Sequence, residues 1–121
     1  MKKTICILIL FPIFFNGYCS DEKSITLTGS IIEKSFYGPP NFGETPKDDR
    51  IEKYFFLLLN KPILYNYKDQ YIFIKEIQLV FTDFYQKNFD KERKYTVIGT
   101  IQKAETGHHH TDFILIVKSF Y

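Results

Sequence analysis

The feature that most limits the fold of this chain is an unbroken apolar run at residues 54–59, Tyr-Phe-Phe-Leu-Leu-Leu. Because the run does not alternate with polar residues, it predicts a central strand buried on both faces. Periodicity alone also permits a buried helix. The aromatic residues and the break at residues 60–62 favour a strand over residues 51–65, in which residues 63–65 continue beyond a bulge.

Four other segments alternate apolar and polar residues and predict further strands. They are residues 24–36, 70–81, 95–101 and 112–120. A glycine within a strand suggests a bulge or a sharp bend, and both Gly29 and Gly99 fit the corners of a small barrel.

One short helix is expected between the third and fourth strands, over residues 83–89, with Thr82 as its N-cap. Five strands with a helix in that position predict a mainly β fold, a five-stranded OB-like Greek-key barrel. A β-sandwich or an SH3-like barrel is compatible with the same order of elements. The length of 121 residues is enough for one domain, placed at residues 20–121.

Residues 1–19 have the pattern of an export signal. Lys2 and Lys3 precede a short apolar run at residues 5–15, and Gly17 and Cys19 suit the small-residue positions of a signal peptidase site. The protein is therefore expected to be exported, into the periplasm or the medium. Cys19 is also a candidate for lipid attachment, although the bulky residue before it fits a lipoprotein signal poorly.

Charge argues against nucleic acid as a partner. The whole chain has 16 basic and 14 acidic residues, and removal of Lys2 and Lys3 leaves 14 of each. Nucleic-acid binding depends largely on lysine and arginine neutralising phosphates. The expected partner is an envelope protein, a peptide or a glycan, with membrane contact only through the signal segment or a lipid anchor.

All three histidines are consecutive, and they precede the last predicted strand. In an extended segment His108, His110 and Asp112 would share one face and His109 the other. With Glu105 they form a candidate site for a divalent metal such as zinc or copper. Alternatively, the three rings fix a turn by hydrogen bonding to the backbone and to threonine hydroxyls.

A second candidate site is the loop at residues 37–46, which is rich in proline and glycine. It cannot form regular structure, yet it contains two aromatic rings. It is expected either to cover one end of the barrel or to line a ligand cleft. The cleft residues would be Tyr37, Gly38, Pro39, Pro40 and Phe42.

Several of these segments together resemble an uncharacterised bacterial family of small exported proteins, the domain of unknown function numbered 4431. The most specific segment is residues 106–111, Thr-Gly-His-His-His-Thr. Others are Gly29, residues 37–40 with 42–43, residues 57–62, Gln78-Leu79 and Gly99-Thr100. The resemblance covers nearly all of residues 20–121 and implies an exported, OB-like domain. It implies no activity.

An enzyme is the least favoured class, because no nucleophile motif surrounds any serine or threonine. Glu105 and Asp112 could act as an acid and a base, but acids that flank a turn are usually just solvated. The sequence therefore predicts an exported binding or structural module of the bacterial envelope. The alternative is a small metal-binding protein that uses the turn from His108 to His110.

Overall fold

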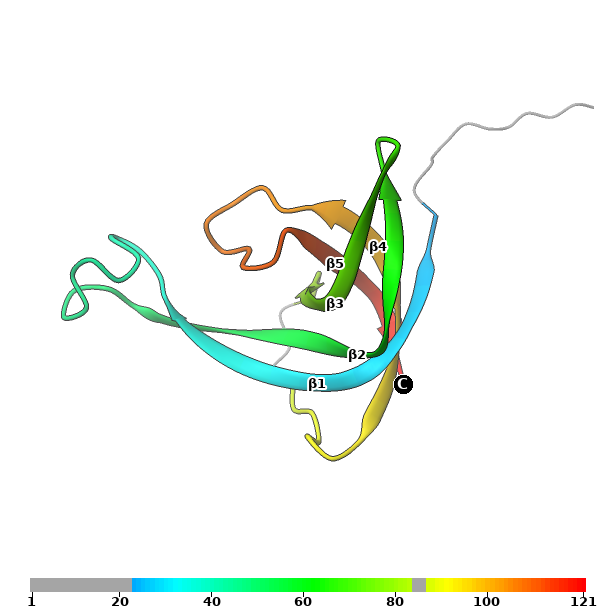
Figure 1. Ribbon diagram of the computed structural model, residues 1–121. Helices are drawn as coiled ribbons and strands as arrows, with labels where there is room; N and C mark the ends of the chain where they lie inside the picture. Colours follow the sequence, from blue (N-terminus) through cyan, green and yellow to red (C-terminus); the bar gives the residue numbers. More distant parts are fainter. Residues whose placement is uncertain (1–22, 84–86) are drawn as a thin grey trace, which may run out of the picture.

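The computed structural model of the protein describes residues 23–83 and 87–121. Five strands pair in the order β1-β2-β3-β5-β4, and β4 returns to β1 to close a barrel (Figure 1). The strands are β1 Ile25–Tyr37, β2 Ile51–Tyr67, β3 Gln70–Phe81, β4 Lys94–Lys103 and β5 Phe113–Phe120.

The pairing confirms the predicted five-stranded OB-like barrel. All neighbouring strands are antiparallel except β3 and β5, which run parallel. The closed sheet excludes a sandwich of two separate sheets. The parallel β3–β5 pair follows from the Greek-key order, because β4 crosses to the far side of β5 before the chain returns beside β3.

The predicted helix over residues 83–89 is not seen. Residues 84–86 lie outside the described residues, and Asp83 and residues 87–89 are not helical. The ring of Phe89 instead packs near Phe55, Tyr95 and Phe120, with centroid distances of 5.0, 5.3 and 5.2 Å. These long-range contacts outweigh the local preference for a helix capped by Thr82.

Gly29 occupies the corner where β1 exchanges neighbours. It pairs with Leu59 of β2 on one side and with Tyr95 of β4 on the other. A Cβ atom added here would lie 2.0 Å from the backbone oxygen of Leu58. The close approach of two backbones therefore requires glycine at this position, as predicted for a barrel corner.

The interior of the barrel is one apolar core to which all five strands contribute. Its buried members include Ile31, Leu57, Ile77, Val97 and Leu115. Phe56 and Ile114 are also buried, at 1% exposure each, yet they alternate with core residues and face the outside of the barrel. A second layer of chain must therefore cover this part of the outer surface.

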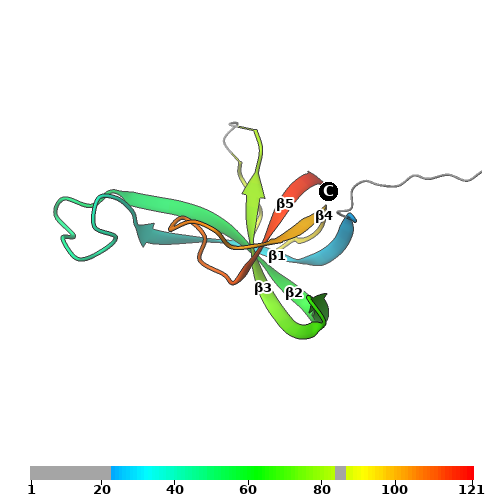
Figure 2. The same ribbon diagram turned by 90° about the horizontal axis from the view of Figure 1, so that it is seen from above.

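β2 largely follows its prediction. Phe56 and Leu57 are buried on opposite faces, but Leu58 is 38% exposed. The expected bulge is present, because the β2–β3 register shifts between Leu58 and Ile63. Beyond that shift the two strands form a hairpin that projects from the barrel (Figures 1 and 2).

The predicted export signal, residues 1–19, lies outside the described residues. Within the part of the chain that is described, there is no helix long and apolar enough to cross a membrane.

Candidate functional site

The histidine loop, residues 104–112, connects β4 to β5 and covers the outer surface of β2 and β3. It lies on the same side of the barrel as the long β1–β2 hairpin (Figures 1 and 2). The loop is not extended as a continuation of β5, since its segment from Gly107 to His108 is a turn. The three histidines consequently point to different partners.

His108 binds two side chains on one face of β2. Its Nδ1 lies 2.8 Å from the carboxylate of Glu52 and 2.8 Å from the hydroxyl of Tyr54. The Tyr54 hydroxyl itself donates to the same Glu52 oxygen, at 2.5 Å. Because the only hydrogen of that hydroxyl is already used, the Nδ1 of His108 must be the donor to both groups.

The electrostatics of this cluster keep each group in the form that the hydrogen bonds require. Donation from Tyr54 is the main reason that the pKa of Glu52 is lowered, and His108 adds to the effect. Burial and the neighbouring Glu52 carboxylate raise the pKa of Tyr54 far above its ordinary value. Near neutral pH, Glu52 is therefore a carboxylate and Tyr54 a protonated donor.

His109 holds the turn together. Its Nδ1 accepts the backbone N–H of Glu105 at 3.0 Å and that of Thr106 at 3.4 Å. In the same turn, the Thr106 hydroxyl accepts the backbone N–H of His108. Within the described part of the chain, His109 alone of the three rings makes the backbone contacts that the alternative prediction expected, and the threonine hydroxyl bonds to the backbone of His108 instead of a ring.

His110 closes the second apolar layer. Its ring stacks on Phe36 with centroids 3.6 Å apart and planes at 5°, and it lies 5.3 Å from the ring of Tyr54. Its Nε2 is buried and has no hydrogen-bond partner among the described residues. Burial is the main cause that lowers the pKa of His110, so the ring is neutral near pH 7.

Gln78 of β3 lies beneath the loop and is 1% exposed. Its Nε2 donates to the backbone oxygen of His108 at 3.0 Å, and its Oε1 accepts the backbone N–H of His110 at 2.6 Å. The Thr111 hydroxyl accepts the backbone N–H of Gln78 and donates to the oxygen of Phe113. One buried side chain thus fixes both ends of the segment that carries the histidines.

The aromatic loop, residues 38–50, connects β1 to β2 and is held by Asp49. This buried carboxylate accepts the backbone N–H groups of Asn41, Gly43 and Thr45 and the Thr45 hydroxyl. Burial alone would raise the pKa of Asp49, but these hydrogen bonds together lower it. The loop is therefore ordered by its own residues.

The two predicted site segments meet in space. The ring of Phe42 lies 6.3 Å from the ring of His108, and a Cβ on Gly107 would lie 3.3 Å from Phe42. Tyr37 and Phe42 line an open hollow of about 580 Å³ together with Ser35, Phe36, Gly107 and His110. Gly38, Pro39 and Pro40 do not line it.

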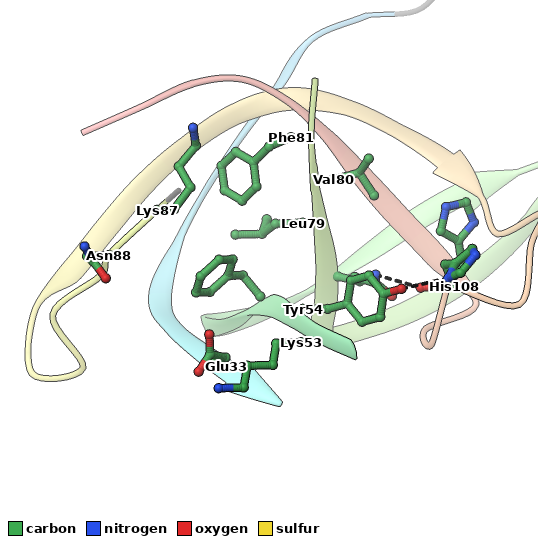
Figure 3. Close-up of a pocket in the computed structure, with 12 residues that line it drawn as sticks. Glu33, Lys53, Tyr54, Leu79, Val80, Phe81, Lys87, Asn88 and His108 are labelled. Atoms are coloured by element: carbon green, nitrogen blue, oxygen red, sulfur yellow. Dashed lines mark hydrogen bonds between the residues drawn. The ribbon is translucent and has the colours of Figure 1, made fainter. Parts of the chain in front are cut away.

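A second pocket, of about 450 Å³, lies beside the Tyr54–His108 contact (Figure 3). Its apolar lining comes from Phe55, Leu79, Val80 and Phe81. Tyr54 and His108 lie at one end in Figure 3, and Lys87 and Asn88 lie at the other. Glu33, Lys53, Gln78 and His109 complete the lining.

The residues predicted as metal ligands do not converge. Glu105 and Asp112 are exposed, and they contribute backbone contacts to the loop. Among residues 23–83 and 87–121, no three His, Cys, Asp or Glu side chains are grouped so that they could hold a metal ion. Sequence reasoning missed Glu52 and Gln78. One signal in the sequence indicated Glu52, which precedes Tyr54 by two residues and so lies on the same face of the strand. No such signal indicated Gln78.

A scan against family models, a search of curated proteins and a search of solved structures each gave no match. The family assignment made from the sequence therefore stays a prediction.

Proposed function

We propose that this protein is an exported binding module of the bacterial envelope that holds an extended peptide segment of another protein. The supporting observation is the 450 Å³ pocket between β2, β3 and the histidine loop. OB-like barrels commonly bind ligands across this sheet face and its flanking loops. Among the residues that the structure describes, the pocket has four apolar lining residues beside eight polar or charged ones. It can therefore take up an apolar side chain and also offer hydrogen bonds to the groups next to it.

The rings in the pocket favour a peptide side chain over a sugar. A glycan needs open aromatic faces on which to stack, but Phe55 and Phe81 pack against each other at 87° and both contact Phe89. What remains is a space with apolar walls and a rim of both charges, from Glu33 and Lys53. An apolar side chain fits the walls, and the adjoining peptide groups can bind the polar rim.

The Tyr54–His108 contact places hydrogen-bonding groups at one end of this pocket. Gln78 and Glu52 hold that end in place from below and from the side. The geometry is therefore fixed before a ligand arrives, which lowers the entropic cost of binding.

The proposal is tested by titrating isotope-labelled protein with N-acetyl-leucinamide, N-acetyl-phenylalaninamide and N-acetylglucosamine. We expect the two amides to shift the backbone resonances of Leu79, Val80 and Phe81, and the sugar to leave them unchanged. Val80→Phe should fill the pocket and abolish the shifts. The matched control is Ile116→Phe, because Ile116 pairs with Val80 on the neighbouring strand but does not line the pocket.

Absence of shifts with all three probes would overturn the proposal that this pocket binds ligands. Shifts with N-acetylglucosamine alone would overturn the peptide assignment in favour of a glycan. Equal loss of binding in Val80→Phe and Ile116→Phe would show that the effect is a general disturbance of the sheet.

A further inference from the structure

The projecting β2–β3 hairpin carries three large apolar side chains in open solvent. Leu64 is 65% exposed, Tyr71 is 70% exposed and Phe73 is 59% exposed. None of them lines the pocket or the hollow described above. A cluster of this kind on a soluble domain usually marks an interaction surface.

The three side chains share one face of the hairpin. Leu64 and Phe73 are direct cross-strand partners, and Tyr71 precedes Phe73 by two residues on the same strand. The opposite face of the hairpin packs on the barrel core through residues that include Ile63, Tyr65, Ile72 and Ile74. The hairpin is therefore apolar on both faces, although the core requires only one.

The charge along the hairpin itself is positive. Two acids also border the face, because Glu76 and the exposed Asp112 line a separate hollow with Phe73, and Glu76 is paired with Lys34. Residues 61–75 contain three exposed lysines, Lys61, Lys68 and Lys75, and one acid, Asp69. The Lys75 ammonium lies over the ring of Phe73, at 5.9 Å from its centroid, so this positive charge borders the exposed face directly. Since residues 20–121 hold equal numbers of basic and acidic residues, the local excess reflects placement and not composition.

We propose that the outer face of the β2–β3 hairpin docks on the surface of an anionic phospholipid bilayer. Exposed aromatic and aliphatic side chains enter the boundary between headgroups and acyl chains, and neighbouring lysines bind the phosphates. The positive rim complements anionic lipid. The sequence predicted membrane contact only through the signal segment or a lipid on Cys19, whereas this contact belongs to the folded barrel itself.

The contact can be measured separately from the signal segment. All five strands lie between Ile25 and Phe120, so a chain that begins at Ser20 contains the complete closed barrel and lacks Cys19. This chain is sedimented with vesicles of phosphatidylcholine alone and of phosphatidylcholine mixed with phosphatidylglycerol. We expect binding to the mixed vesicles, weaker binding to the neutral vesicles, and loss of binding at high salt.

Two variants test the two parts of the face. L64S/Y71S/F73S should lower the partition coefficient by about tenfold or more, because three apolar side chains no longer leave water. Lys68→Glu with Lys75→Glu should abolish the preference for phosphatidylglycerol. The matched control is Ile51→Ser with Tyr121→Ser, which removes two apolar side chains of similar exposure elsewhere, at 58% and 67%. Circular dichroism checks that each variant is folded.

Equal binding of the wild type and the folded triple variant would overturn the proposal, as would the absence of binding to mixed vesicles. Sedimentation equilibrium tests the alternative that this face binds a second copy of the chain. A dimer that is lost in the triple variant, without vesicle binding, would assign the face to a second copy of the chain and also overturn the proposal. The outcome is independent of the pocket, because neither variant changes a residue that lines it.

Discussion

Replacement of Gln78 by leucine is expected to destabilise the protein by about 2–4 kcal/mol. The substitution removes two hydrogen bonds, from Gln78 Nε2 to the His108 oxygen and from the His110 N–H to Gln78 Oε1. Each bond contributes about 1 kcal/mol net, and a buried group left without a partner costs about 1–3 kcal/mol. Leucine recovers part of this loss, because it buries no amide.

Urea unfolding measures the change in the free energy of unfolding. The slope of this free energy against urea concentration should stay the same in the variant, which shows that the two unfolding transitions can be compared. The control is Gln102→Leu, an exposed glutamine on β4, which should change stability by no more than about 0.5 kcal/mol. Amide exchange of His110 should also accelerate in Gln78→Leu. A Gln78→Leu protein as stable as the control would refute the conclusion that these two bonds hold the histidine loop.

Three further predictions concern His110, Gly29 and Asp49. Because burial lowers the pKa of His110, the unfolded chain binds a proton at this ring more readily than the folded protein does. The free energy of unfolding should therefore fall as the pH drops below about 6.5. In His110→Phe, the urea midpoint should no longer show this contribution to its dependence on pH. A urea midpoint that depends on pH equally in His110→Phe and in the wild type would contradict this prediction. Gly29→Ala should cost on the order of 3 kcal/mol in thermal unfolding, since its Cβ would meet a backbone oxygen at 2.0 Å, whereas Gly107→Ala, which meets only a side chain at 3.3 Å, should cost far less. Asp49→Ala should speed amide exchange at Gly43 and Thr45 while the amides of β4 stay protected, and uniform acceleration across the barrel would show that the aromatic loop is not an independent unit.

The strands could be predicted from the sequence because alternation is a local signal. The predicted span of β3, residues 70–81, matches the observed strand. Gly29 was informative for the same reason, since a glycine among alternating residues has few roles in a strand. These features depend on neighbours in the sequence or on one steric requirement.

The site could not be predicted to the same extent, because its contacts join distant parts of the chain. Gln78 alternates with the core residues Ile77 and Leu79 and therefore faces the outside of the barrel. It is buried only because the histidine loop folds over it. The stacking of His110 on Phe36 likewise joins the histidine loop to β1, which lies far away in the sequence. The predicted helix was wrong because Phe89 contacts residues distant in the sequence, which the local pattern of residues does not indicate.

Closure of the barrel through β1 and β4 has a consequence for how the chain folds. Leu27 pairs with Val97 and Gly29 with Tyr95, so the two strands that complete the sheet come from nearly opposite ends of the described chain. The entropy of closing so long a loop must be overcome before this pairing stabilises anything. Barrels dominated by such distant pairings fold in milliseconds to seconds, far more slowly than helical bundles. Until β4 arrives, one edge of β1 lacks its partner strand, and this interval is when the chain is most open to pairing with another molecule.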